Sequence, residues 1–113
     1  MTSNEFWEEE LKERVDANDF AGRPICKNEY GTRSNQGWTL DHILPLAMNG
    51  SDSWDNIQIT HWKTNEEKAD KNTFEANGKL FQVKKIQNLF DEDKMANYPY
   101  KRRHKQYCVI IVD

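Results

Sequence analysis

The chain has 113 residues, of which 36% are hydrophobic and 31% are charged, and its formal net charge at pH 7 is −3. A chain of this length builds one hydrophobic core, so we expect a single domain over residues 1–113. No run of about 18 apolar residues occurs, which argues against a membrane-spanning helix. The acidic N-terminal segment lacks the apolar centre of a secretory signal, so the expected location is cytoplasmic.

The negative charge is concentrated at the N-terminus. Residues 1–20 contain seven acidic and two basic side chains, whereas the other 93 residues contain twelve acidic and fourteen basic ones. Residues 94–105 include five basic side chains and no acidic one. Because clustered basic groups attract phosphate, the overall charge does not exclude a nucleic-acid partner.

The two cysteines, Cys26 and Cys108, are far apart in the sequence, and no CxxC pair occurs. Isolated thiols are usual in a reducing compartment, so we expect both to be free and buried. A disulfide between them is the alternative.

The N-terminal segment predicts an amphipathic helix over residues 3–16. Thr2 and Glu5 have the spacing of a capping box. One apolar face follows the helical period and consists of Trp7, Leu11 and Val15. Residues 23–37 are rich in turn formers and predict a loop with one short strand at Ile25 and Cys26.

A strand, a long loop and a second strand follow. The segment that begins at Trp38 is extended and apolar around Asp41 and His42, and Pro45 disfavours helix in the residue before it. Residues 49–52 favour a turn, and residues 56–60 alternate in polarity as in a strand. The loop between the two strands has about ten residues, and ordered hairpin loops of that length are usually functional.

The next helix should run to about Lys71, with Thr60 or Thr64 as its cap. His61, Asn65 and Lys68 then share one face of the helix. A hairpin followed by a helix that returns across it would bring Asn65 back to Asp41 and His42.

The C-terminal part is less regular. Asn77-Gly78 is a hairpin signal, but the residues after it also fit an amphipathic helix, and we favour a turn followed by a helix over residues 79–91. Residues 97–105 predict a basic loop with tyrosines, and residues 106–113 predict a final buried strand. The fold class is therefore α+β.

Three polar side chains indicate a chemical function. The Asp41 carboxylate and the Asn65 amide oxygen suit a hard divalent cation. The His42 imidazole can take a proton from water near neutral pH. These are the groups that metal-assisted cleavage of a phosphodiester needs.

The spacing of these residues resembles the HNH endonuclease motif. Its elements here are W-x-x-D-H-x-x-P from Trp38 to Pro45, then Asn56, Asn65 and Lys68. The resemblance covers about residues 23–71, and the flanking stretches resemble small free-standing bacterial and phage HNH proteins. It implies a ββα-metal fold with its core at residues 38–71, braced by the N-terminal helix and by C-terminal helix and strand elements.

The resemblance also implies residue roles. His42 would be the general base, and Asn56 would hold the loop that presents it. Asp41 and Asn65 would bind the metal ion, with Asn65 in the place where other members have histidine. One carboxylate and one amide oxygen lead us to expect one Mg²⁺ or Mn²⁺.

Zinc and DNA contacts are further expectations. Members with a zinc ribbon carry cysteines beside the motif, whereas His61 and Thr64 stand at the later pair here and Cys26 is alone upstream, so no structural zinc is expected. His61 could join the metal shell or contact phosphate instead.

Lys68 and Lys71 could contact phosphate or be solvated. The basic loop would add its aromatic and basic side chains, namely Tyr98, Tyr100, Lys101, Arg102, Arg103 and His104.

The predicted function is a DNA endonuclease that nicks with weak sequence preference and leaves 5′-phosphate and 3′-hydroxyl ends. The expected partner is double-stranded DNA, and the protein would act as a monomer or weak homodimer with no membrane association. The alternative is a non-catalytic DNA-binding accessory protein that retains the HNH fold. A toxin nuclease held by an immunity partner is a third reading that the sequence leaves open.

Overall fold

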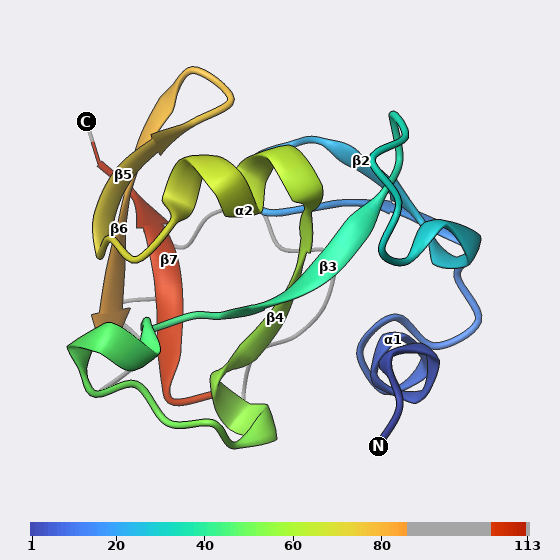
Figure 1. The fold of residues 1–113 in the computed structure, drawn as a ribbon, viewed down its shortest axis with the longest axis horizontal. Coiled ribbons are helices and arrows are strands. Elements are labelled where there is room, and N and C mark those ends of the chain that lie inside the picture. The colour runs from blue at the N-terminus through green and yellow to red at the C-terminus, as the bar shows by residue number, and fades with distance from the viewer. Residues whose placement is uncertain (86–104, 113) are drawn as a thin grey trace.

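A computed structural model describes residues 1–85 and 105–112 of the chain (Figure 1). Helices and antiparallel sheets are mixed, in agreement with the α+β class. No helix in the described part is long and apolar enough to cross a membrane. The regular elements are α1 (Ser3–Leu11), β1 (Asp16–Asn18), β2 (Pro24–Cys26), β3 (Trp38–His42), β4 (Ile57–His61), α2 (Trp62–Lys68), β5 (Thr73–Ala76), β6 (Lys79–Lys85) and β7 (Tyr107–Ile111), with 3₁₀ turns η1 (Lys27–Glu29), η2 (Leu46–Met48) and η3 (Trp54–Asn56).

The β3–β4 hairpin and helix α2 form the centre of the fold. The two strands pair in register from Trp38 opposite His61 to His42 opposite Ile57. Helix α2 begins directly after β4 and turns back across the hairpin, as Figure 1 shows. Both predicted strands and the predicted return of the helix are therefore present.

Two hydrophobic clusters flank this centre. One packs α1, β1 and β2 against the hairpin, and its largest rings, Trp7 and Trp38, have centroids 5.0 Å apart. The other packs the β5–β6–β7 sheet against the segment that carries Phe20. The rings of Phe20 and Phe81 meet edge-on, with their centroids 5.1 Å apart. Aromatic side chains bury large areas, which explains how a chain with few aliphatic residues stabilises two layers around the hairpin.

Helix α1 has the predicted capping box but is shorter than predicted. Thr2 and Glu5 exchange hydrogen bonds at its start. It ends at Leu11 because Lys12 adopts a positive φ of 58°, and the Trp7 indole N–H donates to the Arg14 carbonyl oxygen at 2.7 Å. The prediction that the helix continues to residue 16 was wrong, since Asp16–Asn18 forms strand β1 instead.

Helix α2 also has different ends from those predicted. Strand β4 continues through His61, so the Thr60 side chain is buried in the strand and does not cap the helix. The ring of His61 serves as the cap, because its Nδ1 accepts a hydrogen bond from the Lys63 backbone N–H at 3.0 Å. The helix ends at Lys68 rather than Lys71.

The helix predicted over residues 79–91 was wrong for residues 79–85, which form strand β6. Asn77 and Gly78 both have positive φ, 50° and 78°, as a type I′ hairpin turn requires. Phe81 and Val83 then point to the core with the period of a strand, and β6 pairs with β5 on one side and β7 on the other. Residues 86–91 lie outside the described residues. The predicted final strand is confirmed as β7.

Cys26 and Cys108 are not joined by a disulfide, and Cys108 is buried in β7 whereas Cys26 is half-buried at the end of β2.

Candidate active site

The end of β3 presents Asp41 and His42 beside helix α2. Asp41 pairs with Gln58 of β4 in the hairpin register, and His42 is the last residue of the strand. Successive strand side chains point to opposite faces, so the two neighbours have different environments. Asp41 is buried, whereas the side chain of His42 is 30% exposed.

Asn56 closes the long loop that follows His42. Its backbone carbonyl accepts from the Ile43 N–H at 2.8 Å. Its side chain accepts from the Leu44 N–H and donates to the Leu44 carbonyl, both at 3.0 Å, and also donates to the Ser51 carbonyl at 2.7 Å. The fully buried Asn56 amide thereby ties the end of β3 to the far side of the loop.

Gly50 lets the same loop pass close to its own start. A Cβ at this position would lie 1.9 Å from the Leu44 carbonyl oxygen, a distance that no side chain can occupy. The Gly50 N–H donates to the Pro45 carbonyl at 3.0 Å. The loop after His42 is therefore folded back on the strand end by backbone contacts as well as by Asn56.

His42 has a carboxylate partner. Its Nε2 lies 2.7 Å from Oδ1 of Asp52, which belongs to the folded-back loop and is 84% exposed. No pattern in the sequence distinguished this acid from other turn acids, since Asp is common in turns.

The carboxylate of Asp41 is held from two sides. Gln58 donates to its Oδ2 at 2.8 Å, and the Lys68 ammonium lies 3.2 Å from the same oxygen. Burial raises the pKa of the Asp41 carboxyl above its ordinary value of 3.8, and the charge of Lys68 and the hydrogen bond from Gln58 offset only part of this rise.

Lys68 is fully buried, in contrast to the solvated or phosphate-contacting position expected for it. Besides pairing with Asp41, its Nζ donates to the His42 carbonyl oxygen at 2.8 Å. The ammonium of α2 therefore fixes both residues at the end of β3. Sequence reasoning missed this contact because its partners lie in another element.

Asp41, His42 and Asn65 line one open pocket of about 310 Å³. The structure thus brings together the three residues that sequence reasoning selected for chemistry. The remaining lining residues, which sequence reasoning did not select, are Leu40, Pro45, Leu46, Ala69 and Asp70.

The donors of this pocket fit a hard divalent cation that keeps most of its ligands as water or phosphate oxygens. A carboxylate offers about four acceptor sites, so Gln58 and Lys68 do not use the full capacity of Asp41. Within residues 1–85 and 105–112, no group of three or more His, Cys, Asp or Glu side chains could hold a metal ion. One carboxylate and one amide oxygen differ from the Cys and His ligands that are typical of a tight zinc site.

In the comparison with known protein families, the model of the HNH endonuclease family matches residues 20–74. Residues 20–74 of this chain therefore form an HNH segment. The matched segment contains the hairpin, the folded-back loop and helix α2, with the side chains that contact Asp41 and His42, namely Asp52, Gln58 and Lys68. No curated protein and no solved structure matches the chain.

His61 lies outside the pocket of this HNH domain. Its Nδ1 caps α2, and its Nε2 bonds the Asn35 carbonyl oxygen at 3.0 Å. The His61 backbone N–H donates to the buried carboxylate of Asp19 at 2.9 Å, and Asp19 also accepts from the Ala21 and Arg23 backbone N–H groups. These hydrogen bonds join the chain before β2 to the start of α2, so His61 has a structural task.

The structure describes only some of the residues expected to contact DNA. Lys71 is exposed just beyond α2, near the end of that helix. Tyr98, Tyr100 and residues 101–104, which include Arg102 and Arg103, lie outside the described residues. Lys105, the last basic residue of that segment, is buried and pairs with Glu10.

Proposed function

We propose that this protein is a metal-dependent endonuclease that hydrolyses double-stranded DNA, one strand at a time, and leaves 5′-phosphate and 3′-hydroxyl ends. The observation that carries the proposal is the convergence of Asp41, His42 and Asn65 on one open pocket within the HNH segment. One carboxylate, one imidazole and one amide oxygen are sufficient for metal-assisted attack of water on phosphorus.

His42 is the proposed general base. Its side chain is 30% exposed at the pocket, so water can reach it, and a histidine base works near neutral pH. Asn56 is the proposed positioning residue for His42, because its amide closes the loop that follows the base. Lys68 positions the same strand end through the His42 carbonyl.

Asp41 and Asn65 would hold one Mg²⁺ or Mn²⁺. A bound ion of this kind supplies charge stabilisation to the phosphoryl and leaving oxygens. Asp41 remains shared with Lys68 and Gln58, so we expect weak binding of the ion that is strengthened by substrate phosphate.

In this proposal β3, β4 and α2 are the ββα-metal unit, with its core at residues 38–71, and residues 1–113 act as one domain. Helix α1 and the β5–β6–β7 sheet pack on either side of the unit. Lys71, Arg102 and Arg103 are proposed to contact DNA phosphates. Because one site cleaves one strand, a monomer or weak homodimer would nick DNA. We also expect weak sequence preference and a cytoplasmic location.

A plasmid-nicking assay tests the proposal. The parent should convert supercoiled plasmid to open circles with Mg²⁺ or Mn²⁺ and should be inactive with EDTA. His42→Ala should lose at least about 100-fold in rate, the usual contribution of a general base, while DNA binding persists. Full activity of His42→Ala, or of Asp41→Ala, would refute these assignments.

A non-catalytic DNA-binding protein is the second candidate. The observation that favours it is the buried pairing of Asp41 with Lys68, which occupies part of the carboxylate that would bind the ion. In that case the parent would bind plasmid in a gel-shift assay, and Mg²⁺ and Mn²⁺ would produce no open circles at any protein concentration.

A further inference from the structure

We propose that Asp52 is a positioning residue for His42, which it orients through Nε2 so that Nδ1 is the nitrogen that takes a proton from water. The inference rests on the proposed function, since the choice of nitrogen matters for catalysis only if His42 acts as a base. The hydrogen bond itself can be tested without any activity.

The contact between the two side chains determines which nitrogen of the His42 ring carries the proton. Asp52 Oδ1 lies 2.7 Å from His42 Nε2, within the range of a short charge-assisted hydrogen bond. An ionised carboxylate only accepts, so Nε2 must be the donor. In neutral imidazole the other nitrogen then has a free lone pair, and this assigns Nδ1 as the acceptor.

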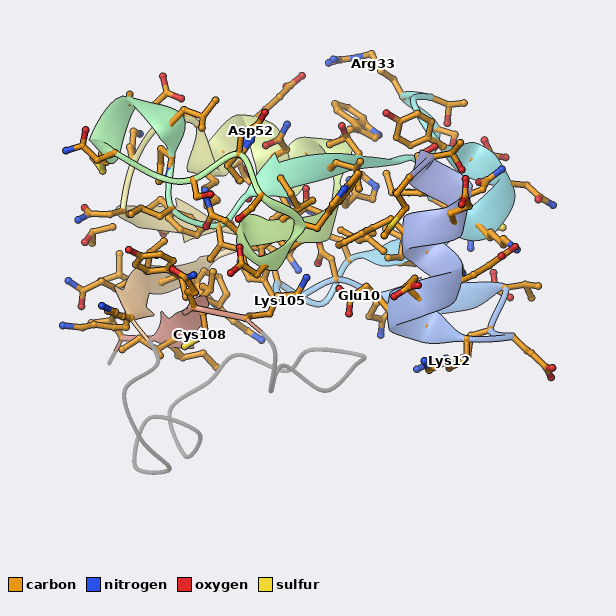
Figure 2. The ribbon with its side chains drawn as sticks, turned by 90° about the horizontal axis from the view of Figure 1, so that it is seen from below. Glu10, Lys12, Arg33, Asp52, Lys105 and Cys108 are labelled. Carbon is orange, nitrogen blue, oxygen red and sulfur yellow. The ribbon has the colours of Figure 1, made fainter. Side chains whose placement is uncertain are left out.

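The backbone on both sides of Asp52 is held, although its side chain is exposed. The Ser51 carbonyl accepts from the Asn56 amide at 2.7 Å. The Ser53 N–H donates to the Ser51 hydroxyl at 3.0 Å. Figure 2 shows Asp52 on the loop between η2 and η3, which is folded back toward the end of β3.

Asn56 therefore has two effects on His42. Through Leu44 it fixes the strand end that carries the ring, and through Ser51 it fixes the loop that carries the ring's partner. Asp52 completes a chain of contacts from the buried amide to the proposed base. A histidine base that is oriented by a carboxylate is a recurring arrangement in enzymes.

Charge gives this role a distinctive kinetic signature. Asp52 places a negative charge beside a site that binds a polyanion, so removal of the charge should not weaken DNA binding. An exposed contact with a charged side chain also contributes little to stability. Loss of Asp52 should therefore lower kcat while KM stays the same or falls, with the melting temperature unchanged.

The first test is nitrogen NMR of the ¹⁵N-labelled, metal-free protein in mildly alkaline solution, in which imidazole is neutral. The ring signals of His42, assigned with His42→Ala, should show one tautomer with the proton on Nε2. Asp52→Asn should shift part of the population to the Nδ1–H tautomer, because an amide can also donate to Nε2. The control Asp55→Asn removes an equal charge nearby and should leave the signals unchanged.

The second test is a double-mutant cycle in the nicking assay with Mg²⁺. Asp52→Asn should lower kcat by about 10- to 100-fold in the parent, as is typical for a residue that orients another. The same change should have almost no effect on the residual rate of His42→Ala, since the residues act as a unit. Asp52→Glu should restore part of the rate.

The outcomes separate this inference from the proposed function. A parent that never cleaves refutes the function, while the NMR result still decides whether Asp52 orients the ring. Identical ring signals in the parent and Asp52→Asn would overturn the inference. If Asp52→Asn lowers the rate by the same factor in the parent and in His42→Ala, the inference would also be overturned.

Discussion

The Lys68 ammonium lies 3.2 Å from the Asp41 carboxylate; both residues are buried, and Asp41 lines the candidate active site. Two charges in this position are stable only as a pair, because each alone would be buried without compensation. The site is therefore built on an ion pair that joins strand β3 to helix α2.

Lys68→Met should destabilise the protein by about 3–5 kcal/mol in urea denaturation, since it leaves the Asp41 carboxylate buried with Gln58 as its neutral donor. The double variant Asp41→Asn/Lys68→Met should recover a large part of this loss, because no unpaired charge remains. Lys63→Met, on the exposed face of the same helix, should change the stability by less than about 0.5 kcal/mol. Additive effects of the two core substitutions would argue against the pairing.

Asn56→Ala should cost about 1–3 kcal/mol in the free energy of unfolding. It leaves the buried Leu44 N–H and the Leu44 and Ser51 carbonyls without their side-chain partner. Nicking should also fall, because the loop that carries Asp52 is no longer tied to the strand that carries His42. The exposed Asn28→Ala serves as control in both measurements. Asn56→Ala with parental stability would mean that the loop is held by other contacts.

The ion pair between Arg23 and Glu67 should make stability depend on pH. Partial burial alone would raise the pKa of Glu67, but hydrogen bonds from the Arg23 side chain and the Asn77 backbone, with the charge of Arg23, lower it below the ordinary 4.5. A lowered pKa in the folded state stabilises the protein above the ordinary value, and this stabilisation is lost as the pH falls through the folded-state pKa.

Glu67→Gln should therefore be less stable than the parent at neutral pH, and the difference should disappear as the solution becomes more acidic than the folded-state pKa. Urea denaturation over a series of pH values measures this. Glu66→Gln, which removes an exposed pair with Arg33 from the same helix, is the matched control and should have a smaller effect at neutral pH. A Glu67→Gln deficit that persists unchanged in acid would contradict the electrostatic explanation.

Local signals in the sequence predicted the parts of the fold around the pocket. Ile57 and Ile59 alternate with polar residues in a strand that is in fact buried, and Asn65 follows at a helical distance, so the return toward Asp41 could be inferred. The capping box of Thr2 and Glu5 was equally local. These predictions succeeded because neighbouring residues along the chain determine the structure there.

Non-local contacts explain the parts that failed. Leu80, Phe81 and Val83 fit both a helical and a strand period, and pairing with β7, far along the chain, selects the strand. The end of α1 depends on an indole hydrogen bond across the turn. The burial of Lys68 depends on a carboxylate 27 residues away. Such partners cannot be identified from the spacing of residues in one segment.

The last prediction concerns Lys105, which sequence reasoning grouped with the basic, phosphate-facing loop. Its ammonium lies 2.5 Å from Glu10 of α1 and donates to the Trp54 and Ile57 carbonyls at 3.2 and 2.9 Å, and Figure 2 shows Glu10 and Lys105 on facing segments. Because these contacts hold the turn η3, Lys105→Met should cost about 3–5 kcal/mol in urea denaturation, whereas the exposed Lys84→Met should not. The slope of log DNA affinity against log salt should be unchanged in Lys105→Met, since a buried ammonium releases no phosphate counterion. A slope smaller by about one would instead identify Lys105 as a phosphate contact.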